Sequence, residues 1–90
     1  PEAASGATSE TERDEIVINV FADGRLVLSG TELTRDELQV ALKAAAQNDP
    51  ETPVTIRGDK LAQHGQIVGV MDACGQAGLY NFAVGTLEGT

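Results

Sequence analysis

The hydrophobic residues near the start of the chain alternate with a period of two. The segment 16–21 is rich in β-branched residues and is bounded by charged ones, which predicts a strand. Asp23-Gly24 follows, and this pair suits a two-residue type I′ turn because both central positions of that turn need positive φ. The segment 25–28 is then the returning strand, so the pattern predicts a β-hairpin.

Two later segments have the helical period. Thr34 and Glu37 have the spacing of a capping box, which predicts a helix that begins there and ends before Asp49-Pro50. A second helix is predicted over about 62–77, with Gly78 in the left-handed position after its end. The buried stripes, which repeat at i, i+3, i+4 and i+7, are Leu38, Ala41, Leu42 and Ala45 in the first helix and Ile67, Val70, Met71 and Cys74 in the second.

Two further short segments are predicted to be strands, which completes an alternating order of elements. They span 54–57 and 80–86, and the second directs Phe82 and Val84 inward. The two strand–helix–strand crossovers should be right-handed, which puts their helices on the same side. The prediction is therefore a two-layer α/β domain of order β-β-α-β-α-β, with both helices on one face of a mixed four-stranded sheet.

Charge and composition narrow the class of partner. The 90 residues form one domain, and six basic residues against fourteen acidic ones give a net charge of −8. This balance argues against nucleic acid and anionic membrane surfaces, which both select clustered Lys and Arg. Residues 1–13 have no apolar period and consist largely of Ala, Ser, Thr, Gly and Glu, so we predict a disordered acidic linker before a folded domain over 14–90.

Residue types that carry catalysis are few, and their spacing is wrong for it. His64 and Cys74 are ten residues apart on the second predicted helix, about 15 Å along its axis, so they do not form a catalytic pair. Gly58-Asp59-Lys60 lacks the second glycine and the Lys-Ser/Thr pair of a phosphate-binding loop. One cysteine excludes an intrachain disulfide and a multi-cysteine metal site. The sequence therefore predicts a binding domain and not an enzyme, with no catalytic, cofactor or metal site.

The second predicted helix is nearly free of charge, which makes it a candidate contact surface. Glycines in a helix interior each cost about 1 kcal/mol relative to Ala, and this cost is tolerated where another backbone approaches closely. Either this helix packs tightly on its own sheet, or it contacts a partner or a second copy. Apart from the charged Asp72, its outward face is predicted to be Gln66, Gly69, Ala73 and Gln76.

The edges of the predicted sheet are a second candidate surface. An open four-stranded sheet leaves two unpaired edges, which are templates for an added strand. The segment before Ile16 or a partner peptide would supply that strand. The alternative is that local charge blunts these edges.

A series of short motifs follows in order over residues 14–86. The motifs are Ile16-Val-Ile-Asn-Val20, Asp23-Gly24 with Leu26-Val-Leu-Ser-Gly30, Thr34-Arg-Asp-Glu-Leu38, Val54-Thr-Ile-Arg-Gly-Asp-Lys60, His64-Gly-Gln-Ile-Val-Gly-Val-Met-Asp72 and Gln76-Ala-Gly78. In this order they resemble the periplasmic domain of the ExbD/TolR family, the small subunits of proton-driven, force-transducing motors in Gram-negative inner membranes. No single motif is specific, so the ordered set carries the resemblance.

The resemblance implies the rest of the protein and its partners. In the family, a transmembrane helix, which is absent from this chain, carries an acidic residue that handles protons, and the present domain follows it in the periplasm. The implied partners are a second copy in a homodimer, an ExbB/TolQ-like channel subunit, and a TonB/TolA-like transducer or peptidoglycan. The resemblance implies no nucleic-acid partner, and the protein contacts the membrane only through the missing N-terminal transmembrane helix.

Some candidate residues come from the family pattern and others from the uncharged helix face. Lys60 either holds a ligand carboxylate or covers its turn, and Asp72 is predicted to be exposed. Met71 and Gly78 also match the family pattern but are placed in the core and at the helix end. The partner-binding candidates are Asp59, Lys60, Gln66, Gly69, Asp72, Ala73 and Gln76. The alternative function is a soluble cytoplasmic ligand-binding or regulatory α/β module, which would need a small-molecule pocket.

Overall fold

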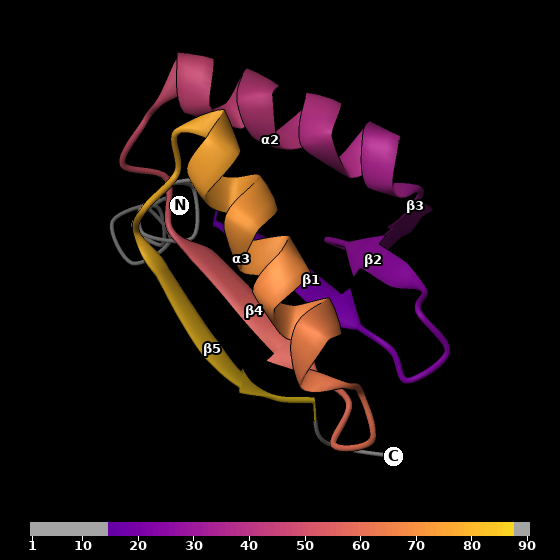
Figure 1. Ribbon diagram of the computed structural model, residues 1–90. Helices are drawn as coiled ribbons and strands as arrows, with labels where there is room; N and C mark the ends of the chain where they lie inside the picture. The colour runs from indigo at the N-terminus through magenta and orange to yellow at the C-terminus, as the bar shows by residue number, and fades with distance from the viewer. Residues whose placement is uncertain (1–14, 88–90) are drawn as a thin grey trace, which may run out of the picture.

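The computed structural model describes residues 15–87, which form a five-stranded mixed sheet with two helices on one face (Figure 1). The order in the sheet is β3-β2-β1-β4-β5; β3, β2 and β1 pair antiparallel, and β1, β4 and β5 pair parallel. The predicted two-layer α/β arrangement is confirmed. The elements are β1 (Ile16–Val20), β2 (Leu26–Leu28), β3 (Thr31–Leu33), α2 (Arg35–Asn48), β4 (Val54–Gly58), α3 (His64–Ala77) and β5 (Phe82–Thr86). The predicted linker over 1–13 lies outside the described residues.

The number of strands was predicted wrongly, because the type I′ turn lies elsewhere. Ser29 and Gly30 have φ values of 47° and 94°, the two consecutive positive angles that this turn requires. They join Leu28 to its cross-strand partner Thr31 and so create β3, a fifth strand that was not predicted. The order of elements along the chain is therefore β-β-β-α-β-α-β instead of the predicted β-β-α-β-α-β.

The turn at Asp23-Gly24 is a longer one. Gly24 has φ 97°, but Asp23 does not have positive φ, so the pair does not form the predicted type I′ turn. The Gly24 N–H donates to the Phe21 carbonyl at 2.9 Å, and the Phe21 N–H donates to the Arg25 carbonyl at 3.0 Å. Three residues therefore make the loop, with glycine in the left-handed position that closes it.

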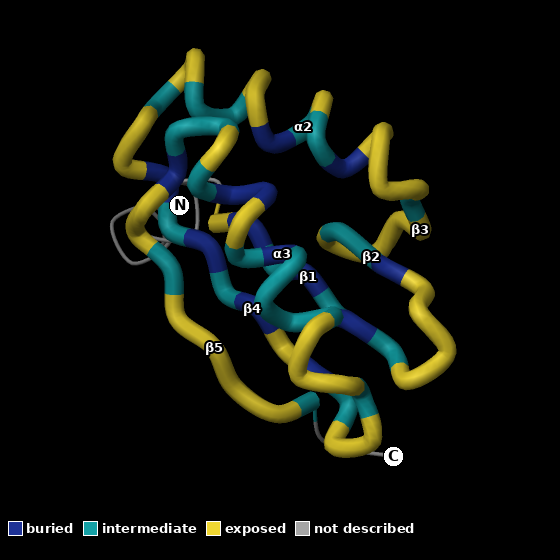
Figure 2. The backbone as a smooth tube through the Cα atoms, viewed as in Figure 1, coloured by how far each residue is buried: buried dark blue, intermediate teal, exposed yellow. Residues whose placement is uncertain are grey.

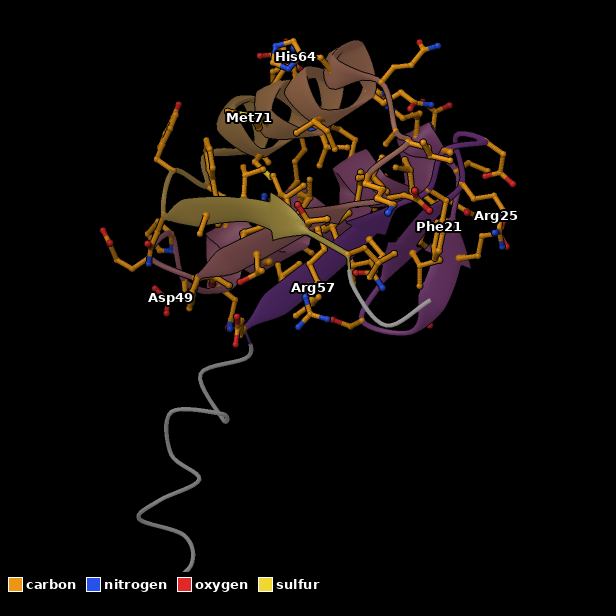
Figure 3. The ribbon with its side chains drawn as sticks, turned by 90° about the horizontal axis from the view of Figure 1, so that it is seen from below. Phe21, Arg25, Asp49, Arg57, His64 and Met71 are labelled. Carbon is orange, nitrogen blue, oxygen red and sulfur yellow. The ribbon has the colours of Figure 1, made fainter. Side chains whose placement is uncertain are left out.

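Side chains hold this β1–β2 turn in place. The Arg25 N–H donates to Asp23 Oδ1 at 3.1 Å, and the Arg25 guanidinium forms an ion pair with the same carboxylate at 3.0 Å. The hydrogen bond from the Arg25 backbone, followed by that from its side chain, lowers the pKa of Asp23. The guanidinium also lies 4.6 Å from the centre of the Phe21 ring. Both side chains are labelled in Figure 3.

The start of α2 and the end of α3 follow the predicted local signals. At the start of α2, Glu37 N–H donates to Thr34 Oγ1 at 3.1 Å and Thr34 N–H donates to Glu37 Oε1 at 2.9 Å, which confirms the capping box. The helix α3 ends at Gly78, whose φ of 99° is left-handed as predicted. The N–H of Leu79 then donates to the Cys74 carbonyl at 2.9 Å and turns the chain back towards the sheet.

The hydrophobic core lies between the sheet and the two helices (Figure 2). The central strands β1 and β4 contribute alternate residues, because successive side chains of a strand point to opposite faces. Val84 was predicted to point into this core but is 50% exposed, since α3 does not cover β5. The largest fully buried side chains are Ile18, Val20, Leu38, Leu42, Val54, Ile56, Val70, Cys74 and Leu79.

Truncation of Leu42 tests this core. Leu42 is fully buried, so Leu42→Ala should lower the free energy of unfolding by about 2–5 kcal/mol through lost burial and the cavity left behind. Val40 lies on the same helix but is 69% exposed, so Val40→Ala should change it by less than about 0.5 kcal/mol. Urea unfolding followed by circular dichroism measures both, and equal effects would contradict the packing described.

Candidate functional site

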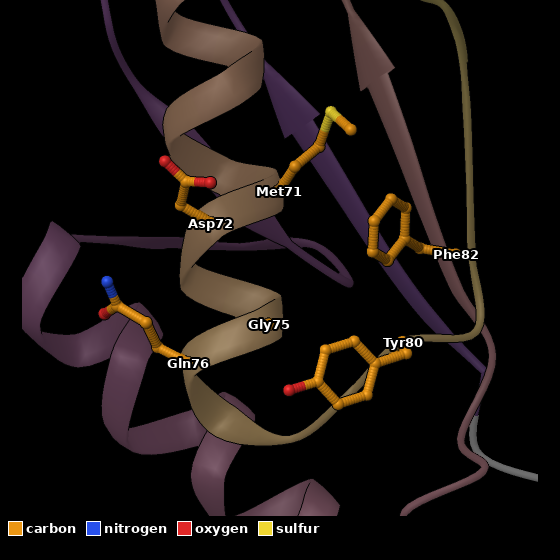
Figure 4. A pocket seen from close by; sticks show the side chains of 6 residues that line it. All are labelled: Met71, Asp72, Gly75, Gln76, Tyr80 and Phe82. Carbon is orange, nitrogen blue, oxygen red and sulfur yellow. The ribbon is translucent and has the colours of Figure 1, made fainter.

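The C-terminal half of α3 and the start of β5 enclose an open groove of about 430 Å³ (Figure 4). Its walls are mostly apolar and aromatic side chains, with polar groups at the rim, which is the usual chemistry of a binding site. The lining residues are Met71, Asp72, Gly75, Gln76, Tyr80 and Phe82.

The helical period places one wall of the groove. Met71 and Gly75 are four residues apart and so lie on the same side of α3, facing β5 (Figure 4). Asp72 and Gln76 each come one position later, and both are exposed at the rim. Gly75 leaves the groove open beside Tyr80, because a Cβ at position 75 would come within 3.6 Å of the Tyr80 ring.

The chain reversal after α3 places the other wall. Leu79 is fully buried, so it anchors the segment between Gly78 and β5 to the core. Tyr80 comes next and is 74% exposed, and Phe82 begins β5 with a half-buried ring. An apolar wall therefore remains in contact with solvent along the edge of the sheet.

Two of the candidates on the helix face lie at the contact between the two helices, and a third lies beside the β1–β2 turn. Ala73 is 7% exposed, and its carbonyl accepts a hydrogen bond from Gln39 Nε2 at 3.1 Å. A Cβ on Gly69 would lie 3.2 Å from the Arg35 guanidinium of α2. Gln66 is half-buried and its Nε2 lies near Gly24 of the β1–β2 turn. The predicted outward orientation of Ala73 was therefore wrong, because α2 covers that sector of α3.

The remaining candidates fall into two separate groups. Asp72 and Gln76 are exposed and border the groove, as the sequence predicted for Asp72. Asp59 and Lys60 lie in the loop before α3, at the opposite end of that helix. Asp59 Oδ1 accepts from the Leu61 N–H at 2.8 Å, which gives this carboxylate a role in its own turn, and Lys60 is exposed.

The sequence did not identify the aromatic wall of the groove. Phe82 and Val84 were assigned to the core and Tyr80 was assigned no role, although the structure leaves Tyr80 and Val84 exposed. One signal was available: the segment Phe82–Thr86 contains no charged residue, although it is the last strand of the sheet. A last strand is often an edge strand, and apolar residues there are candidates for contact.

The residues considered for catalysis are far apart and differently exposed. His64 is exposed at the first position of α3, whereas Cys74 is 0% exposed in the core, as predicted for a small core residue. Burial raises the pKa of the Cys74 thiol. Within residues 15–87, no group of three His, Cys, Asp or Glu side chains is placed to hold a metal ion. Neither helix in this part of the chain has the length and apolar character needed to cross a membrane.

Residues 15–87 thus form a small two-layer α/β domain with a groove between α3 and β5. The family model described as "Biopolymer transport protein ExbD/TolR" matches residues 1–89, so the chain belongs to the ExbD/TolR family. The resemblance found in the ordered motifs is thereby confirmed.

Two relatives show how much of a family member this chain represents. It is 33% identical over 81 residues to the biopolymer transport protein ExbD of Aquifex aeolicus, which covers 90% of this chain and 58% of that protein. It is 29% identical over 84 residues to the ExbD of Pseudomonas aeruginosa, which covers 93% of this chain and 62% of that protein. The chain therefore spans less than two thirds of the length of these relatives.

The buried thiol gives a testable consequence. In the folded protein Cys74 should resist alkylation by iodoacetamide at neutral pH, and it should react readily in concentrated urea. Mass spectrometry measures the alkylated fraction. Alkylation at the same rate in both states would contradict the burial of this side chain.

The raised pKa of the Cys74 thiol also predicts a pH dependence of stability. The free energy of unfolding should fall as the pH rises above the unfolded thiol pKa of 9.0 towards the folded pKa, because the unfolded thiol then ionises first.

Proposed function

We propose that this chain is the periplasmic domain of an inner-membrane, ion-motive-force-driven motor subunit. In this role it couples ion flow to energy-dependent transport or envelope work by docking a TonB/TolA-like transducer or peptidoglycan. The observation that carries the proposal is the family match over residues 1–89. The names of the two relatives, both biopolymer transport proteins, point the same way.

The properties of the domain support a binding role. An open apolar groove with an acidic rim suits contact with another macromolecule. The buried, raised-pKa thiol and the distant His64 offer no nucleophile and base within reach of each other. We therefore propose that the domain performs no chemistry of its own and transmits the work of the motor through contact.

The proposed assembly has contacts both in the membrane and outside it. A membrane-spanning helix of the full-length protein would pair with an ExbB/TolQ-like channel subunit, and the domain would face the periplasm. Two copies would form a homodimer there. The candidates for contact are the half-buried Asp59 and the exposed Lys60 at one end of α3, and the exposed Asp72 and Gln76 beside the groove.

The location of the native protein tests this proposal. The full-length product should sediment with the inner membrane, and the domain should become sensitive to added protease when the outer membrane is opened. Deletion of the gene should abolish an energy-dependent uptake or envelope function. Restoration should require residues 15–87 and should fail when only the region before them is supplied.

The control is an inner-membrane protein whose domain is known to lie in the cytoplasm. In the same cells the added protease should leave that domain intact, because the inner membrane stays closed. A product found in the cytosol would refute the motor role. It would favour the regulatory α/β module, although the fold would be unchanged.

A further inference from the structure

The flank of α2 that turns away from α3 borders two adjoining depressions of about 340 and 350 Å³. On its other flank, Gln39 Nε2 donates to the Ala73 carbonyl at 3.1 Å, and the Arg35 guanidinium lies beside Gly69 of α3. The helical period places Ala44 opposite these contacts. The two depressions have a wall residue in common and are named here the α2 groove. The residues of α2 and β3 that define it are Leu33, Val40, Ala41, Ala44, Ala45 and Asn48.

The α2 side of this groove is apolar although it is in contact with solvent. Between Glu37 and Asn48, the residues of α2 that line it are valine and alanine only. Val40 is 69% exposed, and the outer ridge of α2 is exposed along its length (Figure 2). A β-branched residue also lowers helix propensity. Neither burial in the core nor helix stability therefore accounts for valine at position 40.

The shape of the α2 groove suits a second helix. The peptide groups of α2 are hydrogen-bonded within the helix, so this wall offers no backbone partner to an added strand. β3 has three residues and adds only a short edge. Small side chains such as Ala41, Ala44 and Ala45 let two helices pack at about 8–10 Å between axes. The 14 residues of α2 span about 21 Å, which is the length of four helical turns.

Charge at one end of the groove selects the chemistry of the occupant. Asp36 and Glu37 line the end next to β3, and both are exposed. Of the described residues that line the groove, none is Lys or Arg. Carboxylates in the first turn also stabilise the helix to which they belong, so the test needs a matched acidic residue elsewhere. The groove therefore suits an apolar segment that carries positive charge at one end.

This charge argues against two occupants that the chain itself could supply. A second copy would bring the same acidic end and the same net charge of −8. Residues 1–14 contain four acidic residues and one basic residue, and they include no Val, Ile, Leu, Met or aromatic residue. A segment of that composition lacks both the positive charge and the large apolar side chains that the groove calls for.

We propose that the α2 groove holds an amphipathic helix of a partner protein, which lies alongside α2. Its apolar side chains recur at i, i+3, i+4 and i+7 and pack against Val40 and Ala44. A Lys or Arg at one end pairs with Asp36 and Glu37. The inference goes beyond the proposed function, because the surface is separate from the groove between α3 and β5 and would serve a motor subunit or a regulatory module equally.

A display library of random peptides, selected on the purified 90-residue chain, tests the inference. Peptides of about 16 residues are long enough to span the groove as a helix. The enriched sequences should carry apolar residues at helical spacing and Lys or Arg towards one end. Circular dichroism should show a gain of helix when a synthetic peptide of this set is mixed with the chain.

Two matched pairs of variants locate the bound peptide. Val40→Lys should weaken binding about tenfold or more, because it puts a charge into the apolar wall. Gln47→Lys makes a similar change at an exposed position of α2 that does not line the groove, and should alter binding by less than about twofold. Asp36→Asn should weaken binding about twofold to fivefold, less so in added salt, whereas Asp72→Asn on α3 should leave it unchanged.

A second measurement keeps the test decisive if a variant does not fold. Proline is placed at a central position of the selected peptide, and binding to the unaltered chain is measured. Because proline breaks a helix, the affinity should fall about tenfold or more. In nuclear magnetic resonance spectra, the amide signals of Ala41 and Ala44 should shift on addition of the peptide, and that of Val84 on β5 should not.

Several outcomes would overturn the inference. These are a selection that enriches no peptide, a bound peptide that gains no helix, and equal binding to Val40→Lys and Gln47→Lys. A dimer in sedimentation that Val40→Lys alone dissociates would assign the groove to a second copy. Shifts at Ala44 on removal of residues 1–14, with no peptide present, would assign it to the chain's own N-terminal segment. Location and gene deletion judge the proposed function separately, so either idea can fail while the other stands.

Discussion

The pairing of β1 with its two neighbours is the interaction on which the rest of the domain depends. Ile18 is fully buried and lies in register with Leu28 on the antiparallel side and with Ile56 on the parallel side. A parallel neighbour cannot be reached through a tight turn, so the chain must cross the sheet through a helix between β1 and β4. The same constraint repeats between β4 and β5, and the two crossing helices cover one face and bury these residues.

The parts of the fold that sequence predicts well are those set by neighbouring residues. The capping box at Thr34 and the left-handed Gly78 need a contact three or four residues away, and both are found as expected. The turn prediction failed because Asp23-Gly24 is a stronger local signal than Ser29-Gly30, yet the second pair has the two positive φ values. Pairing of β2 with β1 stabilises that hairpin, and such a tertiary contact leaves no mark in a short segment.

Only part of the candidate site was predicted correctly, because the missing part again depends on contacts between distant segments. The helical period fixes the angles between side chains of α3, but it does not say which sector of the helix a neighbouring helix will cover. Asp72 was therefore placed correctly at the surface, whereas Ala73, one residue later, is buried against α2. Val84 was misplaced because its alternation with Phe82 gives the face of the strand but not the extent of the helix above it.

Asn81 and Leu87 pair with β4 at 2.9 and 2.8 Å, so the peptide groups of Phe82, Val84 and Thr86 point away from the sheet. Their direction has a mechanical consequence. If a partner strand is bound along this edge, a pull along the strand axis strains the hydrogen bonds of Phe82, Val84 and Thr86 together, so that the force is divided among them. A pull at right angles opens them one after another, and each then bears the full force alone. The same contact thus resists tension strongly in one direction and releases its partner easily in another.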